Sequence, residues 1–538
     1  MTTTRRELAL IVAGAVGLTV ALTYPLAFKA GHVARIDNGD GQFAVWNVAW
    51  VARTLVVDPV HVFDANIFYP HKGTLAYSEA NLGAGLLALP TYWLTRNPYA
   101  ALNVAILCGF MLSAIGMYFL VRYLTRDRRA AIISAIAFAF CPYVFAHSAQ
   151  IQLQMVAGLP FSLLAFHRLA DRPTVGRGAA LGASLAAQAV FCGYYEVFAL
   201  LAVGYAVVVV ASTRGYWTAR QFWMAIAAAA LVTVVLVLPM FVPYVRVQRA
   251  GFSRSLELAS SFRATWSTYL ASAAYAHAWL LLRLPPWGEV AFPGIIPTLL
   301  GTAGFVIAAR RRHELALLYG GLGVLAAWAS FGPPAGLYTL MYRTVPLFEW
   351  LRAPARFGLI VTFTVDVLSG VAASYLLPAT RRGTVAAALV TLALVAELST
   401  PSPMREVVPS EPVYRALAAE PAGPVIEMPF FYLDYMFPRH ISYMLESTAH
   451  WRPLVNGYSD FIPKDFRDHV LTLAPFPSRD AFQLLEPLRI RYAVFHMEWY
   501  NVENRKDVIG RLKEFAPYLR LIYADHATRL YEIVGFPR

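Results

Sequence analysis

The sequence predicts a polytopic α-helical membrane protein with an α/β domain at its C-terminal end. Composition supports this fold class, because 58% of the 538 residues are hydrophobic and 14% are charged, whereas soluble domains carry about a quarter charged residues. The arrangement of the apolar residues supports it further. Runs long enough to cross a bilayer recur from Leu8 to Leu398. The remaining residues show short strand and helix patterns instead.

Arginine distribution gives the expected orientation of the membrane spans. The first apolar run, Leu8 to Phe28, follows Arg5 and Arg6 and has no small-residue cleavage site after it, so we interpret it as a retained helix. Arginines then cluster in short segments at alternate span ends, which is typical of cytoplasmic loops. Alternation along the chain predicts about 11 transmembrane helices, with a cytoplasmic N-terminus and an extracytoplasmic C-terminus.

Three outer loops are long, whereas the inner loops are short and basic. Long segments on one face are where binding and catalytic residues concentrate. Leu82 to Leu94, at the end of the first loop, is too short to span and contains Pro90, so we expect a juxtamembrane or re-entrant helix. The long outer loops comprise residues 29–96, 246–294 and 331–356.

The composition changes near residue 400, which predicts two domains: a transmembrane module over residues 1–399 and an extracytoplasmic α/β domain over residues 400–538. Prolines at 401, 403 and 409 mark a linker. Short apolar runs that follow read as buried strands, with helical patterns between them. The predicted strands are residues 424–428, 492–495, 521–523 and 529–534, the last two forming a hairpin.

Several function classes lack support in the sequence. The net charge of +13 comes from arginines at span ends, so it indicates topology and not binding to nucleic acid. Cys108, Cys141 and Cys192 have no metal-binding or disulfide spacing. There is no phosphate-binding GxxxxGK[ST] loop, HExxH or GxSxG motif. ATP-driven transport and soluble-type hydrolysis are therefore not indicated.

Carboxylates in the first outer loop are candidate catalytic groups. Asp37 and Asp40 lie among glycines just after the first span, and residues 43–57 follow with an amphipathic helical pattern rich in aromatic residues. Such a helix suits the membrane interface, aromatic face down, and would hold the acidic loop at the bilayer surface. The alternative is that this segment only caps the helix. Glu79 closes the loop and either forms an acidic pair with Asp40 or caps the next helix.

Further candidates lie at the outer ends of later spans. Glu196, with Tyr195 beside it, interrupts an apolar hairpin, and an ionisable residue there is a functional candidate. Reaching outer water is the alternative, and His147 presents the same choice. Arg352 and Arg356 stand four residues apart where a helix enters the membrane, which suits bidentate binding of a phosphate. Membrane anchoring, or pairing with Glu349, is the alternative.

The order of these features resembles the GT-C superfamily, membrane glycosyltransferases that use polyprenyl-phosphate-linked sugars. An acidic residue in a long first outer loop followed by a juxtamembrane helix matches Asp37 and Asp40, and an extracytoplasmic C-terminal domain is common in that group. The chain is similar to uncharacterised bacterial members in four stretches: Asn66–Pro70, Leu75–Glu79, Leu351–Phe357 and Arg452–Tyr458.

The resemblance implies a multi-pass glycosyltransferase of the cell (inner) membrane, with its about 11 transmembrane helices arranged in a GT-C-like bundle. Asp40 or Asp37 would deprotonate a glycan, lipid or protein acceptor, which would attack the anomeric carbon of a hexosyl or pentosyl donor with inversion. The donor's phosphate would lie near Arg352 and Arg356, and Glu196 near the acceptor or the base. Some relatives need a divalent metal, although the sequence shows no ligand set. Rival interpretations are a transporter or flippase of lipid-linked sugars, or a non-catalytic envelope assembly protein.

Overall fold

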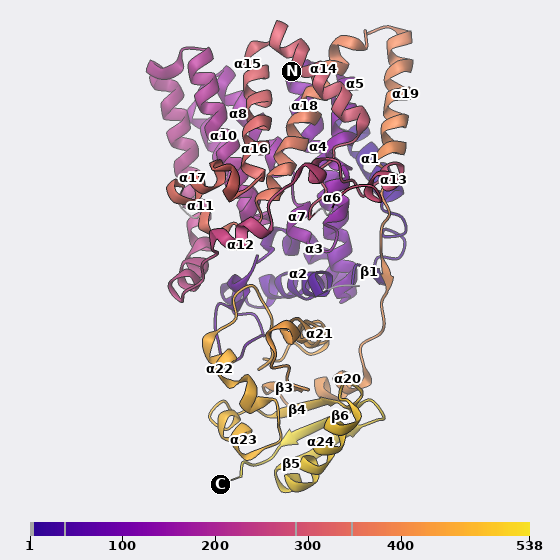
Figure 1. Cartoon of the computed structure of the whole chain (residues 1–538), viewed down its shortest axis with the longest axis vertical. Coiled ribbons are helices and arrows are strands. Elements are labelled where there is room, and N and C mark those ends of the chain that lie inside the picture. Colours follow the sequence, from indigo (N-terminus) through magenta and orange to yellow (C-terminus); the bar gives the residue numbers. More distant parts are fainter. Residues whose placement is uncertain (1–4, 37–38, 286–287, 346–347, 538) are drawn as a thin grey trace. The chain divides into compact units, whose positions relative to one another are not determined.

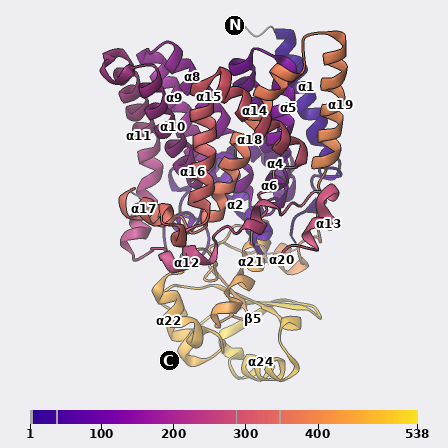
Figure 2. The same ribbon diagram turned by 45° about the horizontal axis from the view of Figure 1, so that its top comes forward.

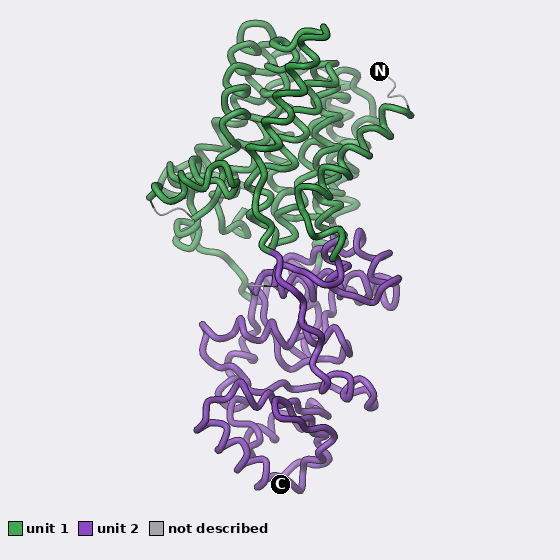
Figure 3. The backbone as a smooth tube through the Cα atoms, turned by 90° about the vertical axis from the view of Figure 1, so that its right-hand side faces the viewer, with its two compact units in different colours: residues 1–29, 104–242, 251–403 green, residues 30–103, 243–250, 404–538 purple. Residues whose placement is uncertain are grey.

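A computed structural model describes residues 5–36, 39–285, 288–345 and 348–537, so Asp37 lies outside the described residues. The chain divides into two compact units (Figure 3). The helical unit comprises residues 1–29, 104–242 and 251–403, and the mixed unit comprises residues 30–103, 243–250 and 404–538. The predicted boundary between residues 399 and 400 stays a prediction.

The helical unit is built almost wholly from helices and short turns (Figure 1). In chain order its helices are α1 (Arg5–Leu22), α4 (Pro98–Thr125), α5 (Arg128–Ala139), α6 (Pro142–Ala146), α7 (Ile151–Gln154), α8 (Gly158–Asp171), α9 (Val175–Phe191), α10 (Gly193–Thr213), α11 (Arg220–Arg249), α12 (Leu256–Ser261), α13 (Ala278–Leu281), α14 (Ile295–Arg311), α15 (His313–Leu315), α16 (Gly321–Ser330), α17 (Leu337–Thr344), α18 (Gly358–Leu376) and α19 (Arg381–Leu398).

Among the described residues, six helical segments are long and apolar enough to cross a membrane. The chain is therefore a mostly helical, multi-pass membrane protein, as the sequence predicts. The predicted number of about 11 spans stays a prediction; α1, α9, α14, α16 and α19 lie where the other spans are expected. The six segments are Pro98–Thr125, Arg128–Ala146, Ile151–Asp171, Gly193–Thr213, Arg220–Arg249 and Pro354–Leu376.

Small residues let α14 and α18 pack closely, and α18 also contacts α16 and α5 (Figure 2). A Cβ atom added at Gly304 would meet the carbonyl oxygen of Leu368 and the amide nitrogen of Ala372. One added at Gly301 would meet the Val365 carbonyl oxygen at 2.9 Å. Close backbone approach through small residues is how membrane helices associate. This packing fixes the helix whose entry segment carries Arg352 and Arg356.

The mixed unit contains the first outer loop together with the C-terminal residues. A four-stranded sheet in the order β3-β4-β6-β5 forms its centre, with β3 and β4 parallel and the other pairs antiparallel. The predicted strands, including the hairpin, are thereby confirmed. Its elements are β1 (Val33–Ala34), α2 (Gly39–Val57), α3 (Leu82–Thr95), β2 (Arg405–Glu406), α20 (Pro412–Ala419), β3 (Val425–Met428), α21 (His440–Glu446), α22 (Lys464–Leu473), α23 (Arg479–Leu485), β4 (Tyr492–His496), α24 (Val502–Glu514), β5 (Leu519–Ala524) and β6 (Thr528–Ile533).

The aromatic residues of α2 are buried in protein, which corrects the expectation that they face the membrane interface. Trp46 is 0% exposed, and its Nε1 donates to Oδ1 of Asn66 at 3.1 Å. Trp50 donates to the carbonyl of Val62 at 2.9 Å, and its ring lies 5.7 Å from that of Trp451. A buried indole needs a partner for its N–H, and these long-range partners are invisible in a helical pattern.

C-terminal residues hold both ends of the segment that carries Asp40. Strand β1 pairs antiparallel with β2, so Val33 lies opposite Glu406. Helix α21 contacts the first turn of α2, where a Cβ atom at Gly39 would meet Ile441 at 2.9 Å. The Ser442 hydroxyl also donates to Gln42 at 3.2 Å. The start of α2 is therefore structured by residues some four hundred positions further along.

Candidate functional site

Arg352 and Arg356 lie on the approach to α18, but not on one helix. A 3-10 turn, Pro354–Phe357, precedes α18, and Arg352 lies before that turn. Proline lacks an amide hydrogen and disfavours helical conformation at the residue before it, and Ala353 accordingly has φ −122° and ψ 84°. The condition for the two arginines to share a helical face is therefore not met.

Each arginine instead covers a different aromatic ring. The Arg356 guanidinium carbon lies 4.7 Å from the ring centre of Tyr194, and that of Arg352 lies 5.7 Å from the ring centre of Phe262. Both distances allow cation–π attraction. The Tyr194 hydroxyl donates to the Ala353 carbonyl at 2.8 Å and accepts from the Ala353 amide at 3.1 Å. Helix α10 thus fixes the turn between the two arginines.

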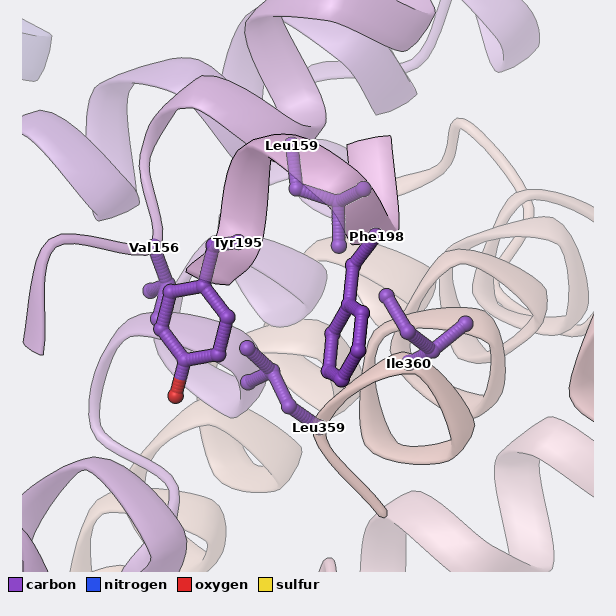
Figure 4. A pocket seen from close by; sticks show the side chains of 6 residues that line it. All are labelled: Val156, Leu159, Tyr195, Phe198, Leu359 and Ile360. Atoms are coloured by element: carbon purple, nitrogen blue, oxygen red, sulfur yellow. The ribbon is translucent and has the colours of Figure 1, made fainter. Parts of the chain in front are cut away.

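An apolar pocket lies about one helical turn along the chain from Arg356. Its lining residues are shown in Figure 4: Val156, Leu159, Tyr195, Phe198, Leu359 and Ile360. The pocket is narrow, with no room for a water-sized sphere, so a ligand would enter only if side chains moved. Leu359 and Ile360 follow Arg356 by three and four residues, and Phe198 follows Tyr194 by four. Tyr194 and Phe198 therefore share a face of α10, and Arg356 lies in the 3-10 turn that leads into α18.

The ring of His147 contacts the carboxylate of Glu289, a residue from the loop before α14. His147 Nε2 lies 3.2 Å from Glu289 Oε2, and the other ring nitrogen, Nδ1, lies 2.8 Å from the Tyr143 carbonyl oxygen. Glu289 Oε1 accepts the Val290 amide at 3.0 Å. Burial would raise the pKa of Glu289, but attraction to His147, the Val290 hydrogen bond and the charge of Arg356 bring that pKa below its ordinary value.

Tyrosine residues connect the His147–Glu289 pair to Arg356. The ring of His147 lies 4.4 Å from that of Tyr143, centre to centre. The hydroxyl groups of Tyr143 and Tyr195 are 3.1 Å apart, and Tyr195 also donates to the Leu153 carbonyl at 3.3 Å. Tyr194, which carries Arg356 on its ring, adjoins Tyr195 in α10. His147, Tyr195 and Arg356 are thus brought into one cluster.

Glu196 follows directly in the first turn of α10. Its side chain is buried, with 5% of the residue exposed, and within the described ranges neither carboxylate oxygen has a hydrogen-bond partner. Burying a carboxylate without a partner is costly. The residue is therefore a candidate for contact with a bound ligand, and its predicted role in substrate binding stays a prediction.

The predicted acidic residues of the first loop lie in the mixed unit. Asp40 is exposed in the first turn of α2. Glu79 is half-buried, and its carbonyl oxygen accepts from the side chain of Asn47, also in α2, at 3.2 Å. Helix α2 thus holds the segment that contains Glu79. The roles of Asp40 and Glu79 in catalysis stay predictions.

The described residues contain no group of three or more His, Cys, Asp or Glu side chains suited to hold a metal ion. A divalent metal, as some GT-C relatives need, therefore has no fitting ligand set in this part of the chain. We accordingly assign no step of a reaction to a metal.

Sequence reasoning missed Glu289. The residue contacts His147, which is 142 positions away in the chain, and no local motif reports such a contact. One signal was present, because Glu257 and Glu289 are the acidic residues of the otherwise basic and apolar loop 246–294. Like Glu79, Glu289 is a carboxylate in a long outer loop, which is the signal that could have identified it as a candidate site residue.

The fold is similar to that of solved GT-C membrane glycosyltransferases over nearly the whole chain, as the resemblance seen in the sequence implies. The chain is similar to arabinofuranosyltransferase AftD from Mycobacteria, with a TM-score of 0.55 and 16% identity over 99% of this chain and 40% of AftD. It is also similar to apo ArnT from Cupriavidus metallidurans, with a TM-score of 0.50 and 13% identity over 99% of both chains. It thus spans about two fifths of the length of AftD. No protein-family model and no curated protein matches the chain.

Proposed function

We propose that the protein is a glycosyltransferase of the cell membrane that moves a hexosyl or pentosyl group from a polyprenyl-phosphate donor to an extracytoplasmic acceptor. The GT-C fold supports the reaction class, and the similar AftD is an arabinofuranosyltransferase. The orientation that goes with this proposal has the N-terminus inside, about 11 spans and the domain over residues 400–538 outside.

One observation carries the proposal: a fixed guanidinium stands one helical turn from an apolar pocket. Arg356 rests on Tyr194, and the next turns of α18 and α10 supply Leu359, Ile360 and Phe198 to the pocket. A helical turn advances about 5.4 Å along the axis. A lipid-linked phosphate has the same two parts in the same order, an anion joined directly to an isoprenoid chain.

The proposed reaction is an inverting displacement at the anomeric carbon. An acceptor hydroxyl forms the new C–O bond while the bond from the anomeric carbon to the phosphate oxygen breaks. The hydroxyl proton goes to the Asp40 carboxylate, which keeps the role of general base expected from the sequence. The electron pair of the broken bond stays on the polyprenyl phosphate, whose charge Arg356 and Arg352 stabilise. Glu196 orients the acceptor.

The decisive experiment is reconstitution of the purified protein in vesicles with undecaprenyl-phosphate-linked sugars and candidate acceptors. Transfer is followed by mass spectrometry, and the configuration of the product by nuclear magnetic resonance. We expect an inverted glycoside from the wild-type protein and none from Asp40→Asn, which removes the base at constant volume. Movement of the intact lipid-linked sugar across the bilayer without a glycoside product would refute the proposal and identify a transporter.

A further inference from the structure

Glu289 has the properties of an ionised hydrogen-bond acceptor with spare capacity. The side chain is 14% exposed and held from two sides, by His147 Nε2 and by the amide of Val290. A carboxylate has about four acceptor positions on its two oxygens. Two are occupied by these donors. The group is therefore oriented by the protein but not saturated by it.

Hydrogen-bond chemistry fixes where the protons of the pair are. A backbone carbonyl only accepts, so His147 Nδ1, at 2.8 Å from the Tyr143 carbonyl oxygen, carries a hydrogen. One further proton then lies between Nε2 and Glu289 Oε2. Both ring nitrogens of His147 are engaged within the protein, which makes it a positioning residue for Glu289.

Glu289 and Arg356 are linked through a shared aromatic cluster. The tilted rings of His147 and Tyr143 lie 4.4 Å apart, the hydroxyls of Tyr143 and Tyr195 are 3.1 Å apart, and the neighbouring Tyr194 carries Arg356 on its ring. Among the described residues no carboxylate lies within 4 Å of the Arg356 guanidinium, yet its charge acts on Glu289. The two opposite charges are therefore near one another without forming an ion pair.

We propose that Glu289 is a specificity-determining residue that accepts a hydrogen bond from a hydroxyl of the donor sugar while Arg356 binds the phosphate attached to that sugar. A sugar phosphate offers hydroxyl donors beside an anion, which is the complement of a carboxylate beside a guanidinium. The inference rests on the proposed function and assigns its donor-sugar contact. A donor without a suitably placed hydroxyl is bound less well because the desolvated carboxylate then loses a partner.

Binding separates this inference from the proposed function. The full chain in lipid nanodiscs is titrated with undecaprenyl phosphate, which has no sugar, and with undecaprenyl phosphoglucose, phosphomannose and phosphoarabinofuranose. We expect the wild-type protein to bind at least one glycosylated probe more tightly than undecaprenyl phosphate. Glu289→Gln should weaken the binding of that probe about tenfold and leave the binding of undecaprenyl phosphate unchanged. Hydrogen bonds to ionised groups are stronger than those to neutral amides by an amount that corresponds to about this factor in affinity.

Control variants keep the test specific. Glu257→Gln removes the other acidic residue of the same loop, an exposed one, and should bind all probes as the wild type does. Arg356→Ala should weaken the binding of every probe. Deoxygenated versions of the preferred probe are also tested, and the one that lacks the contacted hydroxyl should bind wild type and Glu289→Gln equally. Glu289→Asp, which keeps the charge, provides a second variant should the glutamine form misfold.

The outcomes are distinct. Equal weakening of undecaprenyl phosphate and glycosylated probes by Glu289→Gln would overturn the sugar contact and leave the glycosyltransferase proposal standing. Unchanged binding of every probe by both Glu289 variants would do the same. Failure of the wild-type protein to bind undecaprenyl phosphate or any glycosylated form would overturn both proposals together.

Discussion

Replacement of Arg356 by alanine tests the proposed phosphate site most directly. The guanidinium lies 4.7 Å from the ring centre of Tyr194, and Tyr194 in turn holds the backbone of Ala353 through two hydrogen bonds. Arg356 is therefore presented in one orientation before any ligand arrives. A preoriented planar cation binds phosphate through two parallel N–H bonds at little entropic cost.

The expected loss follows from the strength of such bonds. Hydrogen bonds to charged groups contribute roughly 1.5–3 kcal/mol each, and each 1.4 kcal/mol corresponds to about a factor of ten. Arg356→Ala should therefore raise the donor concentration for half-maximal transfer by about ten- to a hundredfold. Arg356→Lys should recover part of this, because the charge remains but the fork geometry is lost. Loss of the cation–π contact should cost about 0.5–2 kcal/mol of stability in the alanine variant.

The assay is initial transfer rate against donor concentration in proteoliposomes, with melting temperature recorded for each variant. Arg343→Ala is the matched control, since Arg343 is an exposed arginine of the same outer loop, in α17. Equal donor dependence in Arg356→Ala, Arg343→Ala and the wild type would show that Arg356 only anchors α18. The phosphate site would then have to be sought elsewhere.

Three further predictions concern other parts of the chain. Glu196→Gln should lower the transfer rate at least tenfold without lowering the melting temperature, because it removes a buried carboxylate without a hydrogen-bond partner in the described structure; intact transfer with a lower melting temperature would make Glu196 structural. Burial lowers the pKa of His496, but the Glu411 carboxylate at 3.5 Å and the hydrogen bond to Glu427 at 3.0 Å outweigh this and raise it to about 9. Since the ordinary value is about 6.5, the stabilisation is complete below that pH and is lost as pH rises to about 9. The melting temperature should fall across this range in the wild type and not in His496→Gln. Reporter proteins fused after Arg129 and at the C-terminus should be active inside and outside the cytoplasm, respectively; reversed signals would contradict the arginine-based orientation.

Local sequence patterns correctly predicted the strands of the C-terminal sheet and identified the charged segment before α18. The runs around Val425–Met428 and Tyr492–His496 were predicted as strands because short, mostly apolar segments between turn signals suit a buried sheet, and they form neighbouring strands. The arginines before α18 were identified because they lie at an outer span end, whereas the arginine clusters that mark topology lie at cytoplasmic ends. The break there has a local cause, because Pro354 between the two arginines lacks an amide hydrogen and disfavours helical conformation at the residue before it.

The features that the sequence could not predict depend on contacts between residues far apart in the chain. Trp46 and Trp50 have the spacing of an interfacial helix, and only the positions of Asn66, Val62 and Trp451 show that they face protein. The contact between Glu289 and His147 also joins residues far apart in the chain, so local sequence patterns do not predict it. Hydrophobic periodicity reports that a face is covered, but it carries no information on whether lipid or protein covers it.

The pairing of the first loop with the C-terminal residues has a consequence for biosynthesis. Gln42 and Ser442 are 400 positions apart, and ribosomes add about 5–20 residues per second. Helix α2 is therefore made roughly 20–80 s before α21 exists to contact it. During that interval strand β1 has no β2 to pair with. A nascent chain released before residue 404 can insert its helices and still lack every C-terminal partner of α2, so the last residues made complete the segment that carries Asp40.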